Sequence, residues 1–135
     1  MKLARFGVSC DAELLTAFDR RLSAEGFKNR SDALAHLMRQ HLLEEKIRGQ
    51  AEVVGVVTMV YDHHRRELSQ RLTRLQHDHH THVLSNLHIH LSHTDCLEVV
   101  VIRGTAGRVQ ELADRLISTH GVKSGRVFIP AAVDA

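Results

Sequence analysis

Two histidines and one cysteine are spaced so that their side chains could bind one metal ion. His88 and His90 alternate with apolar residues in a stretch typical of a β-strand, which places both imidazoles on one face. Cys96 begins a second strand-like stretch after a polar turn, Ser92–Thr94. A three-residue turn would pair His90 with Cys96 and His88 with Glu98, with Cβ atoms about 4.5–5.5 Å apart. Two imidazoles and a thiolate could then reach one ion at bond lengths of roughly 2.0–2.3 Å.

The apolar residues between these donors predict which face of the two strands is buried. We expect the leucine- and valine-rich face to pack on the core and the metal-binding side chains to lie on the opposite face. Glu98 is then either an exposed strand residue or a carboxylate that hydrogen-bonds a ligand imidazole, and we favour the second role. The face expected to be buried carries Leu87, Ile89, Leu91, Leu97, Val99 and Val101.

A fourth ligand could come from the helix that precedes the two strands. Leu68, Leu72 and Leu75 recur at helical spacing and predict its buried side. His79 falls close to that side, whereas His77 lies about 180° from Leu68 at about 100° per residue. His77 should therefore point away from its own sheet, in a direction that suits a ligand donated to another chain.

The ligand types narrow the choice of metal without settling it. Imidazoles and one thiolate suit zinc, copper and nickel, whereas magnesium and calcium prefer oxygen ligands. A histidine-rich tract can also be a surface accident or a loose chelator, and seven of the chain's 12 histidines fall within His77–His93. We expect His41 and His79 to pack on helix stripes, and the other seven histidines to be solvated, namely His36, His63, His64, His80, His82, His93 and His120.

The donors belong to a C-terminal domain that we place at residues 49–135. Apolar periodicity predicts the order strand, helix, strand, strand, helix, strand, which is a split βαβ sandwich of the ferredoxin-like type with helices on one sheet face. The predicted elements are Val53–Tyr61, a helix over Leu68–His82, Leu84–Leu91, Cys96–Ile102, a helix over Val109–Ile117, and Val122–Pro130.

The first 48 residues predict one strand followed by two helices. Apolar residues alternate over Ala4–Cys10, Asp11 can cap a helix that Gly26 ends, and Asn29 or Ser31 can cap a second helix. One strand needs a partner for its backbone groups, and some fifty residues of this kind cannot close a good core. We therefore expect a dimer whose two strands pair, in a chain of the α+β class.

Composition excludes several classes of protein. The chain has 135 residues, 43% hydrophobic and 25% charged, which is typical of a folded domain and not of a disordered or membrane-spanning chain. Two cysteines argue against a disulfide-rich secreted fold, so we expect an intracellular protein. A net charge of +2 is too small for a generic nucleic-acid coat, so any DNA contact must depend on a few placed side chains in the first domain.

Several motifs together resemble the nickel-responsive transcriptional regulator family, NikR. The spacing from His77 through His88 and His90 to Cys96 is the most specific of them. The resemblance covers almost the whole chain and also includes Arg5–Ser9, Gly26–Ala33, Val60–His63, Asp95–Glu98 and Gly121–Gly125.

The resemblance implies a fold and an assembly. It implies an N-terminal ribbon-helix-helix dimer, an ACT-like C-terminal domain and a homotetramer built as a dimer of dimers. It also implies one Ni(II) per subunit in square-planar geometry, held by His88, His90 and Cys96 of one chain and His77 of another.

The resemblance further implies a cytoplasmic repressor of nickel-uptake genes that binds its operator when loaded with nickel. Arg5, Gly7 and Ser9 would lie on the ribbon face that enters the DNA major groove. Gly7 replaces the hydroxyl residue usual in relatives, so either base preference differs or the backbone approaches DNA more closely. Asp32 and His36 fall where relatives have a second, weak metal site, and no metal is assigned to this pair.

Two other classes of function are weighed against this interpretation. A metal chelator or chaperone would bind nickel, copper or zinc and have no operator. An enzyme would need an open metal position or a nucleophile with its base, and four filled ligand positions leave no place for substrate. We therefore expect no catalytic residues.

Overall fold

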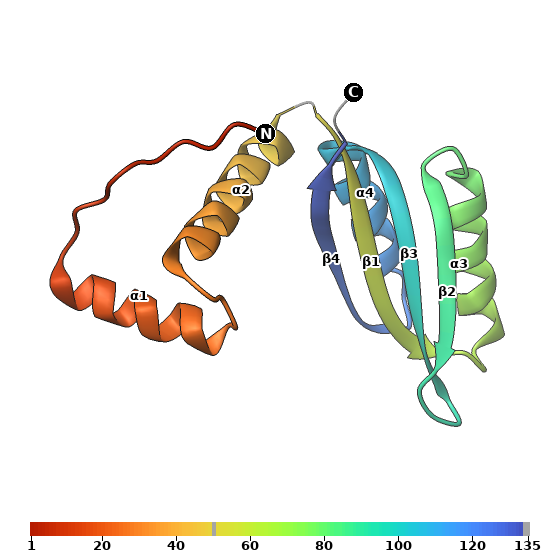
Figure 1. The fold of residues 1–135 in the computed structure, drawn as a ribbon. Coiled ribbons are helices and arrows are strands. Elements are labelled where there is room, and N and C mark those ends of the chain that lie inside the picture. The colour runs from red at the N-terminus through yellow and green to blue at the C-terminus, as the bar shows by residue number, and fades with distance from the viewer. Residues whose placement is uncertain (50, 134–135) are drawn as a thin grey trace. The chain divides into compact units, whose positions relative to one another are not determined.

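The computed structural model describes residues 1–49 and 51–133. The chain divides into two compact units, Met1–Leu42 and Leu43–Ala135. The first unit is helical and the second contains a sheet with helices packed on it (Figure 1). Among the described helices, none is both long enough and apolar enough to cross a membrane.

The first unit contains helix α1, Ala12–Ala24, and most of helix α2, Arg30–Arg48. Asp11 caps α1 as predicted, because its carboxylate accepts hydrogen bonds from the backbone N–H groups of Glu13 and Leu14 at 2.8 and 3.1 Å. Asn29 caps α2 by accepting from the backbone N–H of Asp32 at 2.9 Å. Gly26 adopts a positive φ of 85°, which ends α1 as glycine commonly does.

Ala4–Cys10 does not form a strand within this single chain, and the predicted pairing of two such strands from two chains stays a prediction. Residues 1–10 are exposed and carry no regular secondary structure. A single extended segment gains nothing from a strand conformation unless another strand pairs with it. Among the described residues of this unit, Leu22 and Ala33 are buried, whereas the apolar side chains of Phe6, Val8, Leu14, Leu37, Met38 and Leu42 are exposed.

The second unit has the predicted order of elements, and its antiparallel sheet carries helices on one side. The strands lie in the order β2-β3-β1-β4, and each neighbouring pair is antiparallel. Helices α3 and α4 cover one face (Figure 1). The elements are β1 (Glu52–Asp62), α3 (Arg66–Asp78), β2 (Val83–His90), β3 (Asp95–Thr105), α4 (Ala106–Ile117) and β4 (Val122–Ala132).

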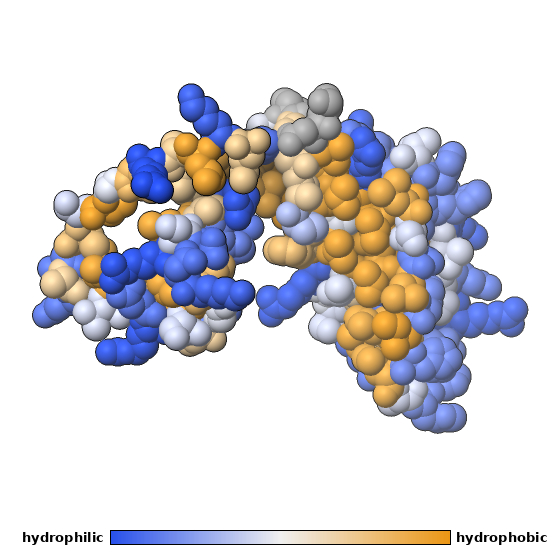
Figure 2. Space-filling model, viewed as in Figure 1, coloured by the Kyte–Doolittle hydropathy of each residue, from blue (hydrophilic) through white to orange (hydrophobic). Residues whose placement is uncertain are grey.

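The helix-covered face of β3 is the opposite of the one predicted. Cys96 and Glu98 face the helices and are 1% exposed, together with Val100 and Ile102. The prediction was wrong because β3 is apolar on both faces, so alternation alone cannot say which face the helices cover. The face expected to be buried is the uncovered one, where Leu87 and Ile89 remain exposed. Figure 2 shows hydrophobic side chains gathered over this uncovered face.

The core lies between the sheet and the two helices. Its helix side chains are Leu68 and Leu72 of α3 and a longer apolar stripe of α4. Gly55 of β1 allows α4 to approach closely, since a Cβ at this position would collide with the side chain of Val109. This packing positions β2 and β3, which carry His88, His90 and Cys96.

Candidate functional site

The pairing of β2 with β3 is the one predicted from the sequence. His90 pairs with Cys96, and His88 pairs with Glu98. Cys96 also pairs with Tyr61 of β1, so His90, Cys96 and Tyr61 form one row across three strands. The hairpin closes tightly through a hydrogen bond from the backbone N–H of Leu91 to the carbonyl oxygen of Asp95, at 2.9 Å. The fold thus brings two imidazole-bearing positions alongside a thiol.

The thiol is buried and the imidazoles are exposed. Cys96 is 1% exposed, whereas the side chain of His88 is 49% exposed. Burial raises the pKa of the Cys96 thiol, because the low-dielectric interior disfavours a thiolate. A hydrogen bond with Tyr61 acts in the opposite direction but does not reverse the shift. A metal ion at this rim would therefore take its imidazoles from the solvent side and its sulfur from the core side.

A buried carboxylate lies directly beside these positions. Glu98 accepts a hydrogen bond from the Tyr61 hydroxyl and another from the Gln76 amide, both at 2.6 Å. Asn86 donates to the side-chain oxygen of Gln76 at 2.9 Å and to Glu98 at 3.4 Å. The Nε2 atom of His88 lies 3.6 Å from Glu98 Oε2. Glu98 is therefore not the exposed strand residue of the first alternative.

Sequence reasoning missed the partners of Glu98. Tyr61, Gln76 and Asn86 come from three different elements, and only the tertiary fold brings them together. One signal was available for Gln76, which falls four residues after Leu72 on the buried side of α3. A polar side chain on a buried helix side needs a hydrogen-bond partner. Burial and the hydrogen bond that the Tyr61 hydroxyl donates to Glu98 raise the pKa of Tyr61 far above its ordinary value.

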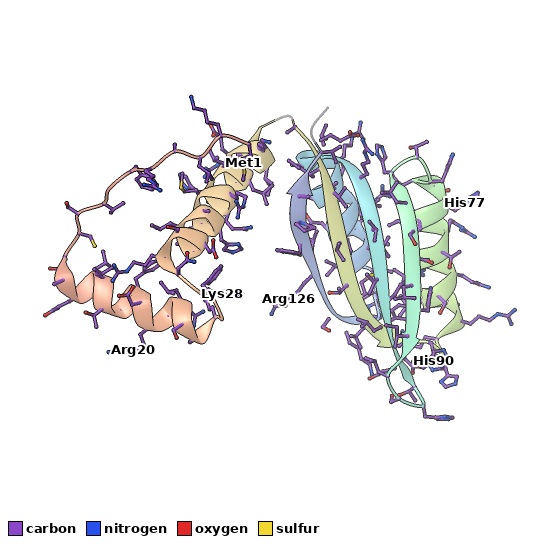
Figure 3. The ribbon with its side chains drawn as sticks, in the orientation of Figure 1. Met1, Arg20, Lys28, His77, His90 and Arg126 are labelled. Carbon is purple, nitrogen blue, oxygen red and sulfur yellow. The ribbon has the colours of Figure 1, made fainter. Side chains whose placement is uncertain are left out.

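His77 lies apart from the other candidate ligands. It is exposed in the last turn of α3, as predicted, and Figure 3 shows it at the opposite end of the unit from His90. Its recorded ring contact is with His80, at a centroid distance of 6.2 Å. The chain by itself therefore does not bring His77 to the hairpin.

No three His, Cys, Asp or Glu side chains converge on a metal-binding geometry within residues 1–49 and 51–133. Two exposed imidazoles and a buried thiol do not attract one another, so nothing within the chain draws them to one point. The pairing of His90 with Cys96 nevertheless holds their Cβ atoms about 4.5–5.5 Å apart, and His88 lies on the same face two residues before His90. The donor set of nitrogen and sulfur fits nickel, copper or zinc.

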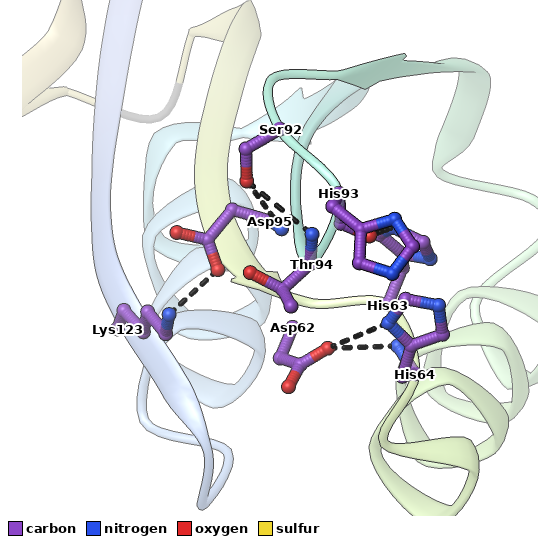
Figure 4. A network of polar contacts seen from close by, with 8 residues as sticks. All are labelled: Asp62, His63, His64, Ser92, His93, Thr94, Asp95 and Lys123. Carbon is purple, nitrogen blue, oxygen red and sulfur yellow. Dashed lines mark hydrogen bonds and ion pairs between the residues drawn. The ribbon is translucent and has the colours of Figure 1, made fainter.

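The turn after β1 and the β2–β3 hairpin pack together through polar contacts (Figure 4). Asp95 accepts a hydrogen bond from Lys123 at 2.6 Å and donates its backbone N–H to Ser92 at 3.0 Å. His63 packs its ring on His90, with ring centroids 4.7 Å apart and an interplanar angle of 14°. His63 is therefore partly buried and not the solvated residue that was predicted.

The candidate DNA-binding and second-site residues are accessible but not assembled. Arg5, Gly7 and Ser9 are exposed in the extended segment before α1. Asp32 is hydrogen-bonded to Asn29, and the ring of His36 lies 5.4 Å from that of Phe27. Both Asp32 and His36 remain exposed on α2.

Comparison with solved structures finds the same fold over part of the chain. An uncharacterized protein from Thermotoga maritima aligns with a TM-score of 0.53 at 14% identity. The alignment covers 59% of this chain and 99% of that protein. At this identity the likeness concerns the fold alone.

Comparison of sequences identifies the family. The NikR C-terminal nickel-binding domain matches residues 54–129. A relative from Trichlorobacter lovleyi is 46% identical over 96% of this chain and 94% of its own length. Relatives from Solibacter usitatus and Geobacter sulfurreducens are 49% and 51% identical, over 94% and 93% of this chain and 92% and 91% of theirs. All three carry the provisional name of nickel-responsive regulator.

These relatives are named as regulators, a non-enzymatic family, and the chain is accordingly not an enzyme. Both the matched domain and the full-length similarity include the paired donors of β2 and β3. The protein belongs to the NikR family of nickel-responsive regulators, whose C-terminal domain binds nickel.

Proposed function

We propose that this protein is a repressor of nickel-uptake genes that binds operator DNA when loaded with Ni(II). Each subunit would hold one nickel ion through His88, His90 and Cys96, and His77 of another chain would complete the site. The observation that carries the proposal is the pairing of His90 with Cys96 beside the buried carboxylate of Glu98. Residues 1–48 would form the DNA-binding domain and residues 49–135 the nickel-binding domain.

The donation of His77 to another chain rests on its position. His77 is exposed and stands far from His90 along the same unit, so it is free to meet a different molecule. A thiolate and three imidazoles fill four positions, which is the number that a square-planar Ni(II) site requires. Glu98 would act through His88, because its Oε2 atom lies 3.6 Å from the His88 ring and a small shift would make a hydrogen bond.

Two exposed apolar surfaces support assembly into a homotetramer. The uncovered sheet face exposes Leu87, Ile89 and Phe128. Contiguous apolar surface of this kind is typical of a protein–protein interface. The first unit leaves most of its apolar residues exposed, which a paired ribbon and a second copy of α1 and α2 would cover. We infer a dimer of dimers in which the two surfaces serve two different contacts.

The DNA-binding face would be carried by the segment before α1. Alternation puts Arg5, Gly7 and Ser9 on one face of a paired strand, and a two-stranded ribbon fits the major groove. Arg5 could hydrogen-bond guanine O6 and N7 together. The regulator would act in the cytoplasm, where its operator lies.

Nickel must favour the arrangement of the protein that binds DNA for regulation to occur. Couplings of this kind are typically about 1–3 kcal/mol, which changes affinity roughly 5- to 150-fold. The test selects operator DNA from a random oligonucleotide pool with nickel-loaded protein and then compares gel shifts with and without nickel. Cys96→Ala and His88→Ala should abolish tight nickel binding and the nickel-dependent shift while the fold is kept, as judged by circular dichroism.

Two outcomes would contradict the proposal. Nickel binding without selection of any DNA sequence would favour a chelator or chaperone. An absorption spectrum that shows tetrahedral or octahedral nickel, with no band from a planar nickel–thiolate centre, would contradict the ligand set. Unchanged nickel affinity in both variants would remove Cys96 and His88 from the site.

A further inference from the structure

Four imidazoles gather where the turn after β1 meets the β2–β3 hairpin. The ring of His63 lies 4.2 Å from that of His64 and 4.7 Å from that of His90, and His64 lies 5.4 Å from His93. We call these four residues the imidazole cluster. His90 is a proposed nickel ligand, and the other three have no role in the proposed site.

Within the imidazole cluster, His63 is the member that contacts His90. The two rings are nearly parallel, with an interplanar angle of 14°, which is a stacked arrangement. His64 and His93 contact each other, and His64 also contacts His63. His90 itself is exposed, so the stack is the contact that limits where its ring can lie.

His63 is held from two sides. Its backbone N–H donates to the carbonyl oxygen of Thr94 at 3.0 Å. Its ring Nε2 lies 3.0 Å from the carbonyl oxygen of His93, which can only accept, so Nε2 carries the proton and donates. Both anchors are backbone atoms of the hairpin that joins the two ligand-bearing strands. The His63 ring is therefore fixed relative to that hairpin.

The stack lies on the same side of the sheet as the sulfur. Tyr61 pairs with Cys96, and Cys96 pairs with His90, so these three side chains share one face. His63 follows Tyr61 by two residues and stacks on His90 at the end of this row. A ring restrained at this place stands beside the thiol with which it would share an ion.

We propose that His63 is a positioning residue that restrains the His90 ring for nickel binding, without itself binding the metal. The inference rests on the proposed function, because it takes His90 as a ligand. An exposed side chain loses conformational entropy when it binds a metal ion. Because the stack on His63 already restricts the His90 ring, His90 loses less entropy when it binds nickel. His63 thereby pre-organises one of the three donors that the chain supplies.

The expected effect follows from the size of aromatic stacking. The free energy of one aromatic pair corresponds to a change of about 2- to 10-fold in a dissociation constant. His63→Ala should therefore raise the nickel dissociation constant by about this factor. His63→Phe keeps an aromatic ring but cannot bind a metal, so it should retain most of the affinity. His93→Ala keeps the backbone carbonyl that anchors His63 and should bind nickel as the parent does.

The experiment measures nickel dissociation constants by competition with a chelator, using the absorption band of the nickel–thiolate centre in the full-length protein. The metal-free protein supplies a second readout, since a stacked ring shifts the imidazole proton resonances of its neighbour in NMR spectra. The His90 resonances should move in His63→Ala and stay near their parent positions in His63→Phe.

Three results would overturn the inference. Equal loss of affinity in His63→Phe and His63→Ala would make His63 a metal ligand, and unchanged affinity in His63→Ala would deny it a role. Unmoved His90 resonances in His63→Ala would mean that the stack is absent in solution. The Cys96→Ala variant separates the two proposals. If this variant still binds nickel, the proposed site fails. If it loses nickel binding while His63→Ala binds nickel as the parent does, only the positioning role of His63 is refuted.

Discussion

Removal of the Glu98 carboxylate should destabilise the C-terminal unit strongly. In Glu98→Ala, the Tyr61 hydroxyl and the Gln76 amide each lose a partner at 2.6 Å, in a place where Glu98 itself is 1% exposed. A buried donor left without an acceptor costs about 1–3 kcal/mol. Two such donors predict a loss of roughly 2–6 kcal/mol, which is a large part of the 5–15 kcal/mol typical of a folded domain.

The assay can use a reporter that the chain already contains. Tyr61 is the chain's one tyrosine, and the chain has no tryptophan, so tyrosine fluorescence reports on β1 beside Glu98. Urea unfolding of the metal-free protein, followed at this fluorescence, should give a lower midpoint with the same slope. Glu98→Gln keeps one acceptor oxygen and should lose about half as much. A Glu98→Ala protein within about 0.5 kcal/mol of the parent would refute the reasoning, since that is the range of neutral surface substitutions.

Three further predictions concern metal and DNA. Mixed oligomers of a His77→Ala chain and a Cys96→Ala chain should recover part of the nickel binding that each lacks alone, and no recovery in verified mixtures would contradict a shared site. Because burial raises the pKa of the Cys96 thiol, nickel must displace a proton from sulfur. Affinity should therefore rise with pH by up to about tenfold per unit for each proton released, and calorimetric titrations that give a constant affinity would contradict this. Arg5→Ala should weaken operator binding in gel shifts while nickel affinity is kept, and Arg108→Ala, at an exposed position of α4, serves as the control. Equal DNA affinity of the Arg5 variant and the parent would remove Arg5 from the interface.

The register of the ligand-bearing hairpin could be predicted because local signals fix it. The polar turn Ser92–Thr94 sets the loop length, and alternation of His88 and His90 with apolar residues sets the strand faces. The order of elements in the second unit was equally local, since helical and strand periodicities differ.

The buried face and the carboxylate network could not be predicted in the same way. Leu97 and Val99 are as apolar as Val100 and Ile102, so the sequence of β3 does not distinguish its two faces. Which face is buried depends on where α3 and α4 pack, and that is a tertiary property. The stack of His63 on His90 also joins residues far apart in sequence, and no periodicity indicates it.

The segment before α1 shows a third limit, because its structure depends on a second molecule. Alternation over Ala4–Cys10 is a strand signal, yet within one chain these residues form no strand. A strand needs a second strand to pair its backbone groups, and the proposed partner belongs to another subunit. Without this pairing, the apolar side chains of Phe6 and Val8 remain exposed.

The last turn of α3 connects two proposed sites through consecutive residues. Gln76 turns inward and donates to Glu98, which lies beside His88 of its own chain. His77 follows it, rotated by about 100° on the helix, and is exposed. A shift of this turn that changes the hydrogen bond from Gln76 to Glu98 also moves the His77 imidazole, which is proposed to bind nickel in another chain. With ligands shared as proposed, nickel at one site therefore biases the position of a ligand at its neighbour, and α3 is the element through which the sites can act together.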